Sequence, residues 1–293
     1  MKKDSEENIL YNENEKKNNS FFRKLFFVIV LIISLTVVYA KYIGTSGLIL
    51  KDYYINNENI PNGYTGFKIA HFSDFHYNKV TGMDKLKTLV KKVNETKPDL
   101  IVFTGDFIDK NYSLTDSEAT NITNELTKLN STYGKYFITG NHDVKCKSYN
   151  KIFEDANFIS LDDTYELIFN KNNEAILLAG LNNDSNGLWL NDVIQKHNVS
   201  YKILLMHKPD TFDDIKQYNF NLVLAGHSHN GQIRLPIYGA ILTPKGAKKY
   251  YKPHYKIDNT DMYISSGIGN TVIDYRLFNR PSFNIYRLNK IGS

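Results

Sequence analysis

The stretch LVLAGHSHNGQ, residues 222–232, combines an apolar run with a polar end. The first four residues are typical of a short strand buried inside a core. The run stops at Gly226, and His227 and His229 follow one residue apart. Two imidazoles on the same side of a strand do not suit an apolar core, but they do suit a metal ion, which imidazole binds well. The stretch therefore predicts a metal site at the end of a buried strand.

Four other apolar runs end in the same kind of polar group, namely FKIAHFS, LIVFTG, KYFITG and KILLM. Ligand sites in α/β folds form at the carboxyl ends of strands, so the five ends are expected to converge. Residues two apart on an extended strand end point to the same side, so each such pair can reach one metal cluster. The candidate residues are Asp74, His76, Asp106, Asn141, His142, His207, His227 and His229.

The order of periodic segments indicates the fold class. Helical spacing over residues 83–93 and a capping box at Thr115–Glu118 place helices between the first strands. Later, ELIFN and AILLAGL flank a turn at residues 171–173, and MYISSG and FNIYRL also resemble strands. Strands that alternate with helices and then form hairpins predict an α/β (α+β) core with two packed β-sheets.

The residue types indicate which metals the site would bind. Imidazole and carboxylate together suit Zn, Fe or Mn, and a thiolate site is excluded because Cys146 is the only cysteine. Seven or eight such groups are too many for one four-coordinate ion, but they fit two ions about 3.5–4 Å apart that share a carboxylate. A single Asp after a strand is usually a helix cap and a single His is usually only hydrogen-bonded, but five such ends are not explained in that way. Three other histidines are interpreted as structural or surface residues: His71, His197 and His254.

The N-terminal region predicts a membrane anchor. Residues 1–20 are polar and are expected to form a disordered cytoplasmic tail, and residues 21–43 a transmembrane signal-anchor. The uncharged residues 25–40 would form a helix of ~24 Å, which flanking aromatic residues can extend toward the ~30 Å of a hydrocarbon core. The alternative is a signal peptide that is cleaved after Ala40, which would secrete the protein.

Charge around the apolar segment predicts its orientation. Arg23 and Lys24 precede it and only Lys41 follows closely, so the N-terminus is expected inside and the body outside. Residues 44–66 are expected to form a linker together with a first edge structure, and residues 67–293 the main domain. The net charge of +5 is too small to indicate nucleic-acid binding, and no protein partner is predicted. The basic stretch at residues 245–256 is either a solvated loop or a rim that attracts a phosphorylated partner or a membrane surface.

The motif order D-x-H, G-D, G-N-H-D, H and G-H-x-H resembles the calcineurin-like metallophosphoesterase superfamily. The resemblance implies a four-layer fold, in which two mixed β-sheets pack together between helices, with a dinuclear centre at its mouth. It implies that Asp106 bridges the two metals, that His142 assists the leaving group, and that Asp109 orients His142. The remaining implied ligands are Asp74, His76 and His229 for the first metal, and Asn141, His207 and His227 for the second.

GHSHNGQ also resembles membrane-associated bacterial members of this superfamily, which typically have G-H-T-H-G-G-Q. Here Ser228 replaces Thr, and Asn230 replaces Gly and places a side chain where substrate access is expected to change. Some members hydrolyse UDP-diacylglucosamine, a nucleotide lipid made inside the cell, whereas the predicted body of this chain faces outward.

The implied chemistry is hydrolysis of a phosphodiester or pyrophosphate bond by a metal-bridging hydroxide. The expected substrate is a lipid-, nucleotide- or cell-envelope-linked phosphate. The enzyme is expected to be associated with a membrane. Two alternatives are a phosphomonoesterase or nucleotide hydrolase acting on soluble substrates, and an inactive metal-stabilised binding domain. The second alternative would be favoured by a missing ligand or a missing His142, and neither is missing.

Overall fold

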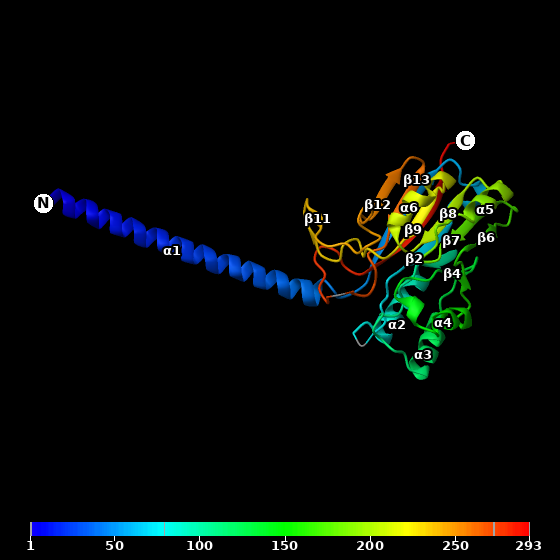
Figure 1. Ribbon diagram of the computed structural model, residues 1–293, viewed down its shortest axis with the longest axis horizontal. Helices are drawn as coiled ribbons and strands as arrows, with labels where there is room; N and C mark the ends of the chain where they lie inside the picture. Colours follow the sequence, from blue (N-terminus) through cyan, green and yellow to red (C-terminus); the bar gives the residue numbers. More distant parts are fainter. Residues whose placement is uncertain (1, 79, 272, 293) are drawn as a thin grey trace.

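The computed structural model describes residues 2–78, 80–271 and 273–292, in which two six-stranded mixed sheets pack against each other (Figure 1). The first sheet has the order β1 (Ile49–Asn57), β14 (Ser282–Lys290), β2 (Lys68–Phe72), β3 (Leu100–Phe103), β4 (Lys135–Phe137) and β5 (Ile159–Ser160). The second has the order β12 (His254–Ile257), β13 (Thr260–Ile264), β9 (Leu222–Ala225), β8 (Lys202–Met206), β7 (Ala175–Gly180) and β6 (Thr164–Phe169).

The apolar strands are buried on both faces because alternate residues belong to different cores. In β3, Leu100 and Val102 pack in the core between the sheets, whereas Ile101 and Phe103 face the helices. Side chains alternate across a strand, so a continuous apolar run is what a sheet covered on both faces requires.

Helices cover the outer faces and complete four layers. One outer core contains side chains of α2 (Met83–Glu95), α3 (Asp116–Leu126) and α4 (Tyr149–Asp155) with those of the first sheet. Another contains side chains of α5 (Leu190–Lys196) and α6 (Phe212–Ile215) with those of the second sheet. The capping box at the start of α3 is formed, and β6 and β7 make the predicted hairpin. The predicted α/β architecture of two packed mixed sheets between helices is confirmed.

Parallel pairing brings the polar strand ends together. β2, β3 and β4 run parallel to one another, and so do β7, β8 and β9. The carboxyl ends of parallel neighbours lie at the same edge of a sheet. A small separate hairpin of β10 (Arg234–Leu235) and β11 (Gly239–Ala240) follows β9.

The segment predicted to be a linker contains a strand of the main sheet. β1 pairs in parallel with β14 over its whole length, and the carboxylate of Asp52 accepts two-pronged hydrogen bonds from Arg287. Ile55 is buried between the sheets, whereas its neighbour Tyr54 is exposed. Gly and Pro on both sides of this segment suggested a linker, but the strand itself depends on a partner more than two hundred residues away.

A long helix precedes the body. α1 runs from Lys2 to Val38 and continues into a π-helical turn, Tyr39–Ile43. Residues 18–43 have an 18-residue window with mean hydropathy 2.4, and no part of that window is buried in protein. By length and composition this segment could cross a membrane, although a signal sequence has the same features. The predicted disordered tail is helical from Lys2 in the structure, since Glu and Lys favour helices and the segment extends a helix that is already nucleated.

Candidate metal centre

The eight candidate side chains come from five neighbouring strand ends. Asp74 and His76 follow β2, Asp106 follows β3, and Asn141 and His142 follow β4. In the second sheet His207 follows β8, and His227 and His229 follow β9. The loops approach closely at Gly105 and Gly140, where an added Cβ would lie 2.6 Å or less from the other loop's backbone. The structure therefore brings together residues that follow five strands separated along the sequence.

The backbone at these ends is not extended. Positive φ angles occur at Asp74 (51°), His76 (49°), Asp106 (60°), His227 (66°) and His229 (48°). The prediction of an extended backbone at the pairs Asp74/His76 and His227/His229 is therefore wrong, although Asp74 and His76 do reach the same donor group. Each chain instead turns through the left-handed region, which is costly for residues other than Gly and is found at functional sites.

Asp74, His76 and His229 form the first donor group, with ligand atoms within 4.8 Å of one another. The Nε2 atoms of His76 and His229 lie only 3.1 Å apart, and all three residues are buried. The carboxylate of Asp74 also accepts hydrogen bonds from the backbone N–H of His227, which joins this group to the second.

Asp106, His207 and His227 form the second donor group. Nε2 of His207 lies 3.2 Å from Oδ2 of Asp106 and 3.1 Å from Oδ1 of Asn141. His207 donates its Nδ1–H to the carbonyl of Thr104, and His227 donates its Nε2–H to the carbonyl of Lys245. In a neutral ring these bonds leave the lone pair on the other nitrogen. Burial alone would lower the pKa of His207, but the charge of Asp106 and the hydrogen bond to it raise that pKa to about 9, so a metal ion bound at Nε2 would displace a proton.

Asp106 lies between the two groups and is the most strongly ionised carboxyl of the site. Its Oδ2 is 3.9 Å from Nε2 of His76 and 3.2 Å from Nε2 of His207. Burial alone would raise its pKa, but attraction to His207 and a hydrogen bond from it hold the pKa well below its usual range. Burial in turn lowers the pKa of His76 to about 4, so this imidazole is neutral at pH 7, as a metal ligand must be.

His142 faces the same space from the end of β4. Its Nε2 lies 3.9 Å from Oδ2 of Asp106, and its Nδ1 accepts a long hydrogen bond, 3.4 Å, from the backbone N–H of Lys110. That bond leaves the proton of the neutral ring on Nε2. Burial lowers the pKa of His142, opposed by the charges of Asp106 and Asp109.

Asp109 does not orient His142 through a hydrogen bond within the described part of the chain. Its carboxylate accepts from the side chain of Asn78 at 3.5 Å and from the backbone of Asn111 at 3.1 Å. The Asp109 side chain bonds to Asn78 and Asn111 instead of His142. The backbone N–H of Lys110 is the group that donates to Nδ1 of His142. Asp109 acts on His142 only through its charge.

Two further residues hold the site together without having been selected from the sequence. Asp143 accepts four backbone N–H bonds, from Asp106, Phe107, Ile108 and Gly140, at 2.6–3.1 Å. Arg276 is fully buried and its Nη2 lies 3.2 Å from Nδ1 of His229. Asp143 stands in the quoted motif G-N-H-D and could have been found there, whereas Arg276 has no local signal.

The remaining sequence interpretations concern residues around the site. Asn230 is buried and is not among the residues that line the cavity described below, so its side chain does not obstruct access from that cavity. His71, His197 and His254 each have a protein partner, as expected of structural residues. Two lysines of the basic stretch form ion pairs, Lys249 with Asp213 and Lys256 with Asp261, and Lys245 lines the cavity.

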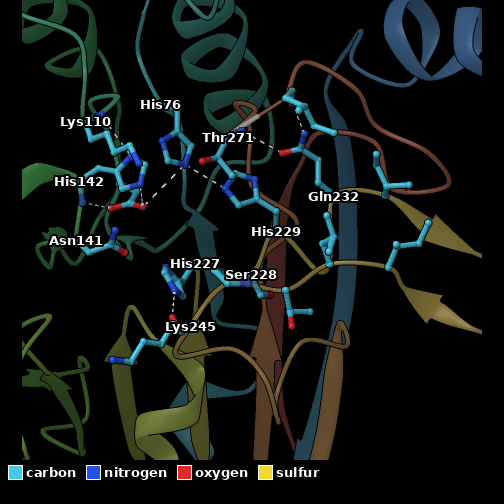
Figure 2. Close-up of a pocket in the computed structure, with 17 residues that line it drawn as sticks. His76, Lys110, Asn141, His142, His227, Ser228, His229, Gln232, Lys245 and Thr271 are labelled. Atoms are coloured by element: carbon cyan, nitrogen blue, oxygen red, sulfur yellow. Dashed lines mark hydrogen bonds and ion pairs between the residues drawn. The ribbon is translucent and has the colours of Figure 1, made fainter.

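The donor groups form one wall of a cavity of about 610 Å³ (Figure 2). Figure 2 shows His76, His142 and His229 turned toward one another, with His227 bonded to the backbone of Lys245 on the opposite side. The other wall comes from residues 232–233 and 241–245, with residues 271 and 273, and is mostly apolar.

The residues present fit a metal centre. His76 and His229 approach through two nitrogens that can share at most one proton, and Nδ1 of His76 is buried without a partner among the described residues. Neutral imidazoles and an ionised carboxylate at this spacing are a donor set for divalent ions of the Zn, Fe and Mn type. Such a donor set at the strand ends of a four-layer sandwich is typical of the class of metal-dependent hydrolases.

Comparison with known proteins gives the family. Residues 67–231 match the family described as "Calcineurin-like phosphoesterase", and the chain belongs to this metallophosphoesterase family. A Bacillus subtilis protein called "Uncharacterized metallophosphoesterase YkuE" is 34% identical over 259 residues, covering 85% of this chain and 88% of that protein. The Escherichia coli protein called "Phosphodiesterase YaeI" is 25% identical over 231 residues, covering 76% of this chain and 82% of that protein. A zebrafish (Danio rerio) protein called "Transmembrane protein with metallophosphoesterase domain" is 26% identical, covering 85% of this chain and 59% of that protein.

Proposed function

We propose that this protein uses two divalent metal ions to hydrolyse a phosphodiester or pyrophosphate bond while α1 anchors it in a membrane. The observation that carries the proposal is the position of Asp106, whose carboxylate lies within 3.9 Å of histidines from both donor groups. The expected substrate is a lipid-, nucleotide- or cell-envelope-linked phosphate. The name of the E. coli relative supports the diester class.

Two ions held by the donor groups and sharing Asp106 would lower the pKa of a shared water toward neutrality and would bind the phosphate oxygens. The protein's part is to keep Asp106 ionised and oriented. His207 stabilises the negative charge of Asp106. Asp143 accepts the backbone N–H of Asp106 and so holds its backbone in place. A carboxylate held on both sides in this way needs no rearrangement when substrate binds.

His142 is the proton donor in this proposal. Lys110 leaves the proton on Nε2, which faces the cavity. His142 acts as a cation, in which Nδ1 also carries a proton and no longer accepts from the N–H of Lys110. The oxygen of a hydroxide forms a bond to phosphorus, and the bond from phosphorus to the leaving oxygen breaks. The leaving oxygen keeps the electron pair and takes the Nε2 proton of the His142 cation, which becomes a neutral imidazole. The negative charge of a bound phosphate raises the pKa of His142, against the effect of burial, and so favours a protonated ring.

The membrane part of the proposal depends on α1. The described residues contain one segment long and apolar enough to span a bilayer, residues 18–43, and it is not buried. Arg23 and Lys24 on its N-terminal side favour an N-terminus inside and the catalytic domain outside. The zebrafish relative's name supports a transmembrane location.

The test separates metal binding from proton donation. The full chain in detergent is stripped of metal, and Mn, Fe or Zn is added back before an aryl phosphodiester and an aryl phosphomonoester are assayed. Asp106→Asn is expected to lose both bound metal and activity. His142→Asn should keep two metals per chain and lose activity by about a hundredfold or more, because only the proton donor is removed.

His254→Asn is the matched control, because His254 is a partly exposed histidine that pairs with Asp261 away from the cavity. It should behave like the unmodified protein. Loss of metal in His142→Asn would contradict its role as a proton donor and make it a ligand. Two bound metals without activity on either ester would favour a binding domain instead, and faster monoester hydrolysis would contradict the diester preference.

A further inference from the structure

The wall of the cavity opposite the donor groups is mostly apolar, with Thr243, Lys245 and Thr271 as its polar members beside Gln232. Ile233, Ile241, Leu242, Pro244 and Ile273 line it. A phosphate and its metal ions require polar partners, and none of these side chains provides one. The wall therefore fits a part of the substrate that carries an apolar chain.

The apolar surface continues outside the cavity onto the β10–β11 hairpin, residues 233–245. At its tip Ile237 is fully exposed and Tyr238 is 75% exposed, and Leu242, which follows β11, is 76% exposed. Large apolar side chains gathered at the tip of a hairpin mark a surface for a protein or a membrane.

This hairpin is joined to the end of α1 through residues 275–277. The backbone N–H of Arg276 donates to the carbonyl of Ala40 at 2.8 Å, and the ammonium of Lys41 lies over the ring of Tyr275. Leu277 next to them bridges to Ile233, and its carbonyl accepts from the N–H of Arg234 at 3.0 Å. Figure 1 shows the hairpin, labelled β11, on the side of the body where α1 leaves.

Positive charge surrounds the same junction. Lys41 is exposed beside Tyr275, and Lys245 is exposed at the cavity. Arg280 donates to the carbonyl of Ser46 just beyond the helix. Cations beside exposed apolar side chains are the pattern of a surface that contacts lipid head groups. This pattern, and the position beside an apolar helix, favour a bilayer over a protein partner.

We propose that the β10–β11 hairpin enters the bilayer that holds α1, and that the cavity takes a lipid phosphate from it. The apolar chain would lie along Ile241 and Leu242, and the phosphate against His142 and His227. The substrate class is then an amphiphilic phosphodiester or pyrophosphate, and its water-soluble half leaves the membrane after hydrolysis. This inference rests on the proposed function.

The first test measures insertion without using activity. The full chain is placed in vesicles of phosphatidylcholine and phosphatidylglycerol whose acyl chains carry bromine, which quenches tryptophan fluorescence. Trp189→Phe removes the only native tryptophan. Ile237→Trp in this background is expected to be strongly quenched, whereas Leu188→Trp is not, because exposed Leu188 precedes α5 on the second sheet's outer face. Equal, weak quenching of both would overturn the proposal.

The second test measures the substrate preference. A diacylglycerol para-nitrophenyl phosphodiester in vesicles is compared with methyl para-nitrophenyl phosphate in solution. Ile237→Glu should lower kcat/KM for the lipid ester by about tenfold, since the anchoring apolar side chain is lost, and leave the soluble ester unchanged. Leu188→Glu, a change of the same kind at an exposed site away from the hairpin, should change neither.

The outcomes distinguish the two proposals. Metal-dependent hydrolysis of the soluble ester with no effect of Ile237→Glu on the lipid ester would overturn the inference and leave the proposed function standing. No hydrolysis of either ester would contradict the proposed function, and the quenching measurement would still decide whether the hairpin enters the bilayer.

Discussion

At the scale of single residues, Asp143 holds two loops of the site together through hydrogen bonds to their backbone. Each of its oxygens accepts two backbone N–H bonds, and these come from the loops that carry Asp106 and Asn141. A carboxylate suits this position because it only accepts hydrogen bonds.

Asp143→Asn is therefore expected to place an NH₂ group against backbone N–H donors and leave two of them without an acceptor. The free energy of unfolding should fall by about 2 kcal/mol or more, and metal affinity should fall with it although Asp143 is not a ligand. Urea unfolding and calorimetric metal titration measure the two effects. Asp109→Asn is the matched control, because its carboxylate accepts from Asn78 and Asn111 and not from the backbone of Asp106 or Gly140. Unchanged metal affinity in Asp143→Asn would refute the role given to Asp143.

The sequence reveals residues of this kind only where they stand in a motif. Asp74 and His227 could be selected because each directly follows an apolar run. Arg276 could not, since it reaches His229 across forty-seven positions and no residue beside it indicates burial. The left-handed backbone at Asp74 and His229 also has no signal, because neither is a Gly and tertiary contacts impose the conformation.

At the scale of secondary structure elements, β1 is the edge strand of the first sheet, in a segment whose sequence indicates both a linker and edge structure. Strands such as β3 and β8 were found from their apolar runs alone. β1 mixes polar and apolar residues, and most of its side chains are exposed or half-buried, as is usual at the edge of a sheet. It becomes a strand only by pairing with β14. Pairing partners this distant in sequence are not visible in local periodicity.

Two neighbouring residues of β1 test whether this element is part of the folded body. Ile55→Ala is expected to lower the free energy of unfolding by about 2–4 kcal/mol, because it leaves a cavity between the sheets. Tyr54→Ala, on the exposed face, should cost about 0.5 kcal/mol or less. Thermal or urea unfolding of both variants measures the difference. Equal and small effects would mean that residues 49–57 behave as the linker predicted from the sequence.

At the scale of the whole molecule, the junction between α1 and the body is packed and not hinged. Gly44 is buried there, and an added Cβ would lie 1.8 Å from the carbonyl oxygen of Arg276. Only Gly permits this approach, which brings the N–H of Arg276 to the carbonyl of Ala40.

Gly44→Ala should force the two segments apart and break the hydrogen bond from Arg276 to Ala40. Amide hydrogen exchange at Arg276 is expected to become faster, while exchange in β2 and β3 stays slow. Gly82→Ala is the matched control, because its added Cβ would have only one neighbour, at 3.7 Å. Unchanged protection at Arg276 in Gly44→Ala would mean that the helix and body are not joined at this point.

The place of β14 in the first sheet has a consequence for how the protein is made. β14 lies between β1 and β2, so the strand that follows the anchor and the strand that carries Asp74 are both held by residues 282–290. Ribosomes add residues in order, and α1 emerges long before β14 exists. The first sheet therefore closes only after residues 282–290 have been synthesised. In the topology proposed above, with α1 as the anchor and the body outside, the body would cross the membrane as an unfolded chain and assemble its metal site on the far side, where the metal supply of that compartment would determine which ions it receives.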